Sequence, residues 1–242
     1  MERQTQLYFW VNLVNKHKNE LSIVQEYFER TKVTFDNIDS EAEEHAEFIY
    51  SNTGGAEEDQ ASLAEFAEEK GYELYETLAL MKSNHLLMTI SMLYHVWEQQ
   101  LIKFCIKELS NDIKFEKKSL DYADVKNIFE VHGIKIEDKN SWKKLRELKA
   151  LVNTIKHGDG DSANKLRKIR PDFFKIDFLK NTDTLELHES VLLDEYSLQV
   201  NEVDFIDYLN ATKEFWDEMP ERAYANIDCV LEKLNSKNKK KK

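Results

Sequence analysis

A long apolar stretch without glycine or proline constrains the fold of this chain most. Neither residue occurs from Tyr72 to Leu109, so nothing there forces a turn or breaks a helix. Apolar residues recur along the stretch at helical spacing, and further methionine and isoleucine side chains fall on its other faces. A helix that is apolar on several sides is usually central in a bundle. The stretch therefore predicts a long central helix, or two closely joined helices, that starts near Ala61 and pauses at Gly71.

Composition supports a mainly α fold for the rest of the chain. Only six glycines and two prolines occur in 242 residues, which leaves few places for the tight turns of an all-β protein. Ser40, Asp121, Ser141 and Asn201 are placed as helix N-caps. The expected helices besides the central one are 4–18, 20–31, 40–50, 121–131, 142–157, 161–170, 201–219 and 221–234. Alternation between 185 and 200 predicts one or two short strands, and a hairpin if there are two.

These elements suggest an order of segments along the chain. We expect an N-terminal helical and acidic segment at 1–60, a helical core at 61–180, a short β element with C-terminal helices at 181–236, and a disordered basic tail at 237–242. The tract SNTGGAEEDQ at 51–60 reads as a loop or hinge.

Motifs for metals, cofactors and membranes are missing from the sequence. The two cysteines match no metal spacing and favour a reducing cytoplasm. The apolar run LYFWVNLV is too short to span a bilayer and does not resemble a signal peptide. The DGD at 159–161 lacks the remaining ligands of a calcium loop, and no phosphate loop or HExxH occurs. We therefore expect a cytoplasmic protein with no cofactor, metal or membrane contact.

Charge is distributed unevenly along the chain, whose formal net charge is −12. Residues 41–76 hold twelve acidic residues and one lysine, whereas residues 143–175 hold ten Lys and Arg against four Asp and Glu. The basic block is compatible with a nucleic-acid or phosphate-binding face, with docking of the acidic block onto it, or with simple solvated helix faces.

A polar stripe runs along the helix expected at 142–157. At about 100° per residue, Arg146, Lys149, Asn153 and His157 fall on one side. The opposite, apolar side is formed by Leu145, Leu148, Leu151, Val152 and Ile155. The stripe ends at Gly158, because glycine adopts the left-handed conformation of a helix C-terminus without steric cost.

The central helix carries a second polar stripe, formed by Ser91, His95 and Glu98. Polar groups on a mostly buried helix need hydrogen-bond partners, so we expect this stripe to face another polar helix. A satisfied core pair is the alternative to a functional role for His95 and Glu98.

A long central helix followed by a terminal Asn-x-x-x-His resembles the HEPN family, compact helical bundles that often dimerise and include many metal-independent ribonucleases. The resemblance covers Leu86 to Gly158. The family pattern is an arginine followed a few residues later by a histidine, often with asparagine directly after the arginine. In the segment VNTIKHG, Asn153 and His157 match the pattern, but Val152 stands where the family has arginine.

The resemblance implies roles for these residues. In active members the arginine stabilises the phosphate charge and the histidine assists attack by the ribose 2′-hydroxyl, so loss of the arginine removes electrostatic stabilisation. It implies a catalytic group of His157 and Asn153, with Arg146 as a substitute cation and with Glu98 and His95 on the preceding helix. Phosphate contacts are expected from Lys149, Lys156, Lys165, Arg167, Lys168 and Arg170.

Two functions follow from the sequence as expectations. In the first, a symmetric homodimer binds RNA and acts as a metal-independent endoribonuclease, as in toxin–antitoxin and antiviral defence systems. In the second, the chain is a catalytically inactive helical scaffold that dimerises and binds a protein partner. A third alternative gives Lys156 and His157 no functional role, because cations at a helix C-terminus also complement the helix dipole.

Overall fold

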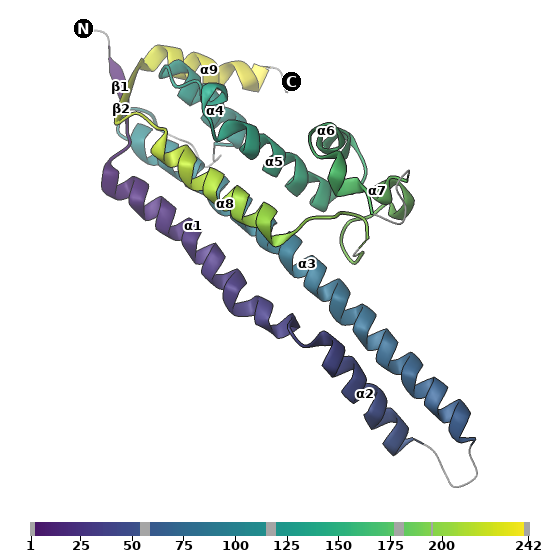
Figure 1. Ribbon diagram of the computed structural model, residues 1–242. Coiled ribbons are helices and arrows are strands. Elements are labelled where there is room, and N and C mark those ends of the chain that lie inside the picture. The colour runs from purple at the N-terminus through teal and green to yellow at the C-terminus, as the bar shows by residue number, and fades with distance from the viewer. Residues whose placement is uncertain (1–2, 54–58, 115–119, 177–181, 195, 240–242) are drawn as a thin grey trace. The chain divides into compact units, whose positions relative to one another are not determined.

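The computed structural model describes residues 3–53, 59–114, 120–176, 182–194 and 196–239. It is mainly helical (Figure 1), which confirms the fold class. The predicted loop or hinge at 51–60 and the predicted basic tail at 237–242 lie partly outside the described residues.

Two short strands form the sheet. β1 (Gln4–Tyr8) pairs antiparallel with β2 (Arg222–Asn226), with Gln6 opposite Tyr224. Thr5 and Leu7 are buried while their neighbours on β1 are half-buried or exposed, because successive side chains of a strand point to opposite faces. The predictions of helices from Gln4 and from residue 221 were therefore wrong at these strands.

The predicted strands between 185 and 200 were also wrong. Residues Thr184–His188 form a short helix, α7, whose N-cap Asp183 accepts a hydrogen bond from the Glu186 N–H at 2.9 Å. The described residues between α7 and residue 202, namely 189–194 and 196–201, form no strand. An N-cap bond satisfies one of the helix's first amide groups, which favours helix over strand locally.

The N-terminal half consists of long helices. α1 (Val11–Lys32) is one helix where two were predicted, and it continues through a short 3₁₀ helix, η1 (Val33–Phe35). α2 (Ile38–Asn52) has Asn37 as its N-cap in place of the predicted Ser40. α3 (Gln60–Leu109) is a single helix of 50 residues.

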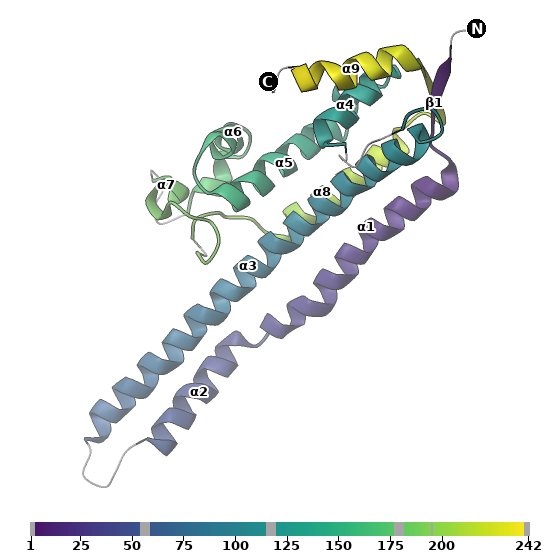
Figure 2. The ribbon, with the colours of Figure 1, turned by 180° about the vertical axis from the view of Figure 1, so that it is seen from behind.

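Gly71 does not interrupt α3. It is buried and lies within the continuous helix. A Cβ at this position would be 2.9 Å from the Ala46 Cβ and 3.0 Å from the Ala42 carbonyl oxygen. The predicted pause was wrong, because glycine here allows α2 and α3 to approach closely. α2 and the first part of α3 run side by side (Figures 1 and 2).

The remaining helices mostly begin and end where local signals placed them. α4 (Tyr122–Val131) starts after Asp121, which forms a reciprocal capping box with Asp124. A 3₁₀ helix, η2 (Ile136–Asp138), leads to α5 (Trp142–His157). The later elements are α6 (Asp161–Ile169), η3 (Pro171–Phe174), α8 (Glu202–Asp217) and α9 (Ile227–Lys239). α9 packs on α4 (Figure 2) and extends beyond the predicted start of the tail.

The chain forms two compact units, assembled from separate stretches. Unit 1 consists of residues 1–25, 90–152 and 202–242, and unit 2 of residues 26–89 and 153–201. Helices α1, α3 and α5 each contribute residues to both units.

Aromatic rings fill the core of unit 1. Phe9 stacks on Phe104 at 4.5 Å between ring centroids, and Trp216 meets Phe104 edge to face at 5.9 Å. Gln100 is buried beside these rings. Its amide oxygen accepts from Trp216 Nε1 at 3.2 Å, and its amide nitrogen donates to the His17 carbonyl at 3.0 Å. The polar groups of Gln100 are thus paired inside an apolar core.

In unit 2, His85 of α3 joins α1 to α3. Its ring stacks on Phe28 at 5.3 Å between centroids, and its Nε2 lies 2.7 Å from the Thr31 hydroxyl. Burial lowers the pKa of His85, which favours the neutral ring in this aromatic setting.

No helix among the described residues is both long enough and apolar enough to cross a membrane.

Candidate functional site

The site predicted from the sequence centres on α5. The start of this helix is held by Glu218, which follows α8. The Glu218 carboxylate accepts from the Asn140 N–H at 2.6 Å, and from the Ser141 N–H at 3.3 Å and hydroxyl at 2.6 Å. A carboxylate at a helix N-terminus satisfies unpaired amide groups and complements the helix dipole. Glu218 therefore fixes where α5 starts in unit 1.

The predicted apolar side of α5 is confirmed. All five of its residues are buried: Leu145, Leu148, Leu151, Val152 and Ile155. Val152 is only 3% exposed. The position at which the HEPN family carries arginine is thus part of the apolar core in this chain.

Two candidate cations of α5 lie in unit 1. Arg146 is exposed, while Lys149 is half-buried with its ammonium 4.1 Å from the centroid of the Tyr122 ring. A cation over an aromatic face is stabilised by the ring quadrupole. Tyr122 therefore holds Lys149 against the body of unit 1.

Glu98 and His95 of α3 also lie in unit 1. Glu98 Oε1 accepts from the Tyr94 hydroxyl at 3.0 Å, and Oε2 lies 3.9 Å from His95 Nδ1. Burial and the nearby Glu98 charge raise the pKa of both Tyr94 and Tyr122. The Glu98 carboxylate thus lies beside His95 and the neutral Tyr94, and its charge also acts on Tyr122.

The candidates at the end of α5 lie in unit 2. Asn153 is half-buried, and Lys156 and His157 are exposed. Gly158 has φ +68°, and its N–H donates to the Thr154 carbonyl at 2.9 Å. The predicted left-handed end of the helix is confirmed. A Cβ at Gly158 would lie 2.9 Å from the Glu189 carbonyl oxygen, so the loop after α7 also requires glycine here.

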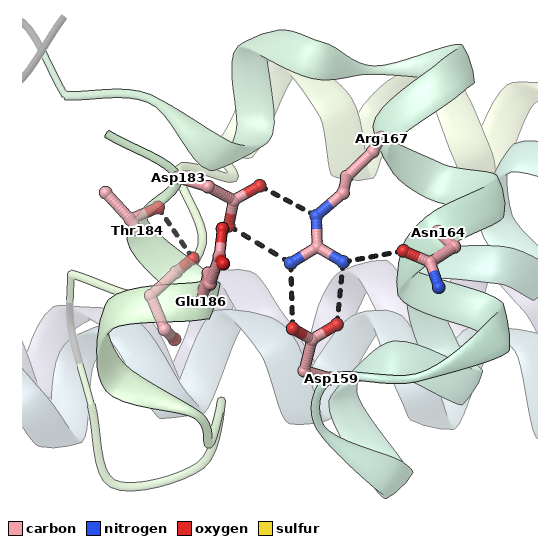
Figure 3. Close-up of polar contacts among 7 residues, drawn as sticks. Asp159, Asn164, Arg167, Asp183, Thr184 and Glu186 are labelled. Atoms are coloured by element: carbon pink, nitrogen blue, oxygen red, sulfur yellow. Dashed lines mark hydrogen bonds and ion pairs between the residues drawn. The ribbon is translucent and has the colours of Figure 1, made fainter. Parts of the chain in front are cut away.

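Arg167 of α6 is enclosed by carboxylates (Figure 3). Nε and Nη2 donate to Asp183 at 2.7 and 3.1 Å, and Nη1 and Nη2 donate to Asp159 at 2.6 and 3.0 Å. Nη1 also donates to Asn164 Oδ1 at 3.0 Å. A guanidinium has five N–H donors, and this arrangement uses all of them. Phosphate binding by Arg167 would require one of these carboxylates to be displaced.

The electrostatics of this cluster reflect its close ion pairs. Hydrogen bonds from Arg167 lower the pKa of Asp159. Burial acts to raise the pKa of Asp183, but hydrogen bonds from Arg167 and from the Glu186 N–H outweigh it and lower the pKa overall. Hydrogen bonds to Asp183 and Asp159 raise the pKa of Arg167. Both carboxylates are therefore charged at neutral pH.

The other basic residues of the α6 region divide into two kinds. The Arg170 guanidinium stacks on Phe173 at 3.7 Å and donates to Asp172 at 2.6 to 3.0 Å. Lys165 and Lys168 are exposed. Both arginines thus pair within unit 2, whereas the two lysines extend into solvent.

The predicted site residues fall into both units. Unit 1 contains His95, Glu98, Arg146 and Lys149, and unit 2 contains Asn153, Lys156, His157, Lys165, Arg167, Lys168 and Arg170. The predicted orientation of His157 by Glu98 or His95 would involve both units, and it stays a prediction.

Sequence reasoning missed the partners of these residues. Tyr94 and Tyr122 gave no signal beyond their aromatic type. Asp159 was noticed only as an incomplete calcium motif. Asp183 had a usable signal, because it stands three residues before Glu186 as an N-cap residue does in a capping-box pattern.

Comparisons with protein-family models, with curated proteins and with solved structures give no match to this chain.

Proposed function

We propose that this protein binds RNA through a basic face in unit 2 and does not cleave it. The basic face consists of Lys156 and His157 at the end of α5 and Lys165 and Lys168 of α6. All four side chains are exposed. Lysines track a phosphate backbone by charge, without a fixed geometry.

One observation carries the proposal, namely that two of the three acidic residues between 153 and 175 are paired with arginines of the same segment. Asp159 pairs with Arg167, and Asp172 pairs with Arg170. The third acidic residue between 153 and 175 is Asp161, in the first turn of α6. Pairing of the arginines with carboxylates leaves lysine as the main source of exposed charge, so the segment attracts polyanions.

The absence of cleavage in the proposal rests on Val152. RNA cleavage of the HEPN type would need a cation to stabilise the charge that develops on the phosphate, and the family supplies it as arginine at the position of Val152. The residue at that position is apolar and buried. Membership of the HEPN family remains a hypothesis, and within it this chain would be a binding member.

A salt titration with a fluorescent single-stranded RNA tests binding. Lys156→Ala and Lys168→Ala should each weaken binding and reduce the slope of log affinity against log salt by about 0.7, the release expected for one contact to a single strand. Lys103→Ala removes an exposed lysine from α3 in unit 1 and serves as the control. Equal effects of Lys103→Ala and Lys168→Ala would refute the basic face.

Incubation of the same RNA with the protein in EDTA tests cleavage. We expect intact RNA with the wild type and also with His157→Ala, which keeps the three lysines of the basic face. Shortened RNA that disappears with His157→Ala would establish the ribonuclease instead, since an acid–base histidine contributes typically about 10²–10⁴-fold.

A protein-partner role is the second candidate. It is favoured by exposed aromatic side chains on α2 and α3, which include Phe48 and Phe66. Because these residues are distinct from the basic face, both roles are compatible in one molecule.

A further inference from the structure

The helical hairpin of α2 and residues 60–78 of α3 has its small residues inside. Ala42 and Ala67 are buried, and Gly71 approaches Ala46 and the Ala42 backbone more closely than a Cβ would allow. Helices that touch through alanine and glycine come close together but bury little apolar area per residue. At Gly71 the interface of the hairpin therefore has no room for a larger side chain.

Its large aromatic side chains lie outside this interface. Phe48 of α2 is 61% exposed and Phe66 of α3 is 41% exposed. Phenylalanine has no polar atom to form hydrogen bonds with water, so exposure of these apolar surfaces is unfavourable in the isolated chain. Exposed apolar groups that cluster on one surface mark interaction sites.

Helical periodicity places the two phenylalanines on the same flank. Phe48 lies about a third of a turn behind Ala42, and Phe66 lies about a third of a turn behind Ala67. α2 and the first part of α3 run in opposite directions (Figure 1), so equal rotations in the same sense lead to the same flank. We call this the phenylalanine flank. Tyr50 and Tyr75 are rotated the other way and belong to the opposite flank.

Exposed carboxylates border the phenylalanine flank. Glu44 precedes Phe48 by one helical turn and Glu41 by two, while Glu73 follows Phe66 by two turns. Lys70, the one lysine in the acidic block 41–76, shows how this surface receives a cation. Its ammonium lies 5.5 Å from the centroid of the Phe66 ring and 2.7 Å from Glu73 Oε2.

The charge of the phenylalanine flank distinguishes between two possible binding partners, a second copy of this chain and a basic helix. Residues 41–76 have a net charge of −11, so the same flank on a second copy would meet strong like-charge repulsion. A partner helix with apolar residues on one face and lysine or arginine beside them meets both the phenyl rings and the carboxylates. Helix-in-groove recognition commonly takes this form.

We propose that the phenylalanine flank is a docking surface for a basic amphipathic helix of a partner protein. Phe48 and Phe66 contact the apolar face of that helix, and Glu41, Glu44 and Glu73 pair with its cations.

The experiment uses the full chain and a labelled helical peptide of about 18 leucine and lysine residues, with leucine on one face. We expect it to bind the wild type, and more weakly as salt rises. A Phe48→Ala/Phe66→Ala variant should weaken binding about tenfold or more, because aromatic anchors dominate such interfaces. A Glu41→Gln/Glu44→Gln/Glu73→Gln variant should reduce both the affinity and its salt dependence.

Matched controls separate this surface from general stickiness. Tyr50→Ala/Tyr75→Ala removes two exposed aromatic side chains of the opposite flank and should leave binding unchanged, with circular dichroism to verify folding of each variant. Equal losses in the Phe and Tyr variants would overturn the proposal, as would equal binding of a leucine and glutamate peptide.

Two further outcomes would assign the flank to another occupant and also overturn the proposal. Stronger peptide binding after Lys156→Ala/Lys165→Ala/Lys168→Ala would indicate the chain's own basic segment. A wild-type dimer in light scattering that Phe48→Ala/Phe66→Ala converts to a monomer would indicate a second copy.

Discussion

Arg167 and Asp183 form a two-point ion pair, with Nε 2.7 Å from Oδ2 and Nη2 3.1 Å from Oδ1. Asp183 is also the N-cap of α7, where it accepts from the Glu186 N–H. Arg167 therefore links α6 to the start of α7 within unit 2. Planar, bidentate geometry of this kind is specific to arginine.

Arg167→Ala should destabilise the protein by about 1–2 kcal/mol, because it leaves Asp159 and Asp183 without their shared cation in a partly exposed setting. Arg167→Lys should recover only part of this loss, since an ammonium cannot make the paired bonds. Urea unfolding measures the change, with exposed Arg146→Ala as the control. Full stability of Arg167→Lys would show that charge alone is sufficient.

Gly158→Ala should cost about 1–3 kcal/mol of unfolding free energy, because its φ of +68° is unfavourable for alanine and the new Cβ would meet the Glu189 carbonyl. Gly133→Ala shares the left-handed backbone, with φ +77°, but meets open space, and should cost about 1 kcal/mol. Gly160→Ser, in extended backbone with open space, should change stability little. An equal cost at Gly133 and Gly158 would exclude the contribution of Glu189.

Two buried histidines of unit 1 should make the protein less stable in acid. Burial is the main cause that lowers the pKa of His17 and of His132 from 6.5. Nδ1 of His132 donates to the Ile128 carbonyl at 2.7 Å, and Nε2 of each ring is buried without a hydrogen-bond partner in the described structure. Protonation of either ring would thus bury an N–H with no acceptor.

The direction of this pH dependence of stability follows from proton binding. Below pH 6.5 the unfolded chain binds protons at these histidines more readily than the folded chain, so the free energy of unfolding decreases as the pH is lowered. Each histidine contributes a slope of at most about 1.4 kcal/mol per pH unit. His17→Phe and His132→Phe should each flatten this slope in urea unfolding between pH 5 and 8, taken as an approximate window. An unchanged slope in the double variant would contradict this assignment.

The symmetric homodimer expected from the HEPN resemblance stays a prediction. Two copies would double the basic face, since closed symmetry repeats the same surface. Light scattering over a range of protein concentrations should show twice the monomer mass, and RNA affinity should fall on dilution to the monomer. A monomer mass at every concentration would remove dimerisation from the proposed RNA-binding mechanism.

The sequence predicted helix ends well where one residue's backbone chemistry sets them. Asp121 starts α4 by binding the Asp124 N–H, and Gly158 ends α5 in the left-handed conformation. The sheet was predicted in the wrong place because β1 and β2 lie at opposite ends of the chain, whereas the alternation at 185–200 resembled a strand locally. Pairing between distant strands leaves no local pattern.

The candidate site shows the same division. The buried side of α5 was predictable, because five apolar residues repeat at helical spacing and every one is buried. The sequence did not predict which basic residues are exposed and which are held in ion pairs. Arg167 and Lys168 are adjacent cations in the sequence, yet one donates to two carboxylates and the other is exposed.

The sequence by itself determined that this protein is helical, where α4 and α5 begin and end, and which side of α5 is buried, because these depend on backbone preference and on the spacing of apolar residues. Tertiary structure alone decided that Gly71 continues α3, that Gln4–Tyr8 is a strand, and that Asp159 and Asp183 enclose Arg167. Each of these outcomes depends on a residue distant along the chain: Ala46 beside Gly71, β2 beside β1, and Asp183 beside Arg167. Local propensity carries no information about such neighbours.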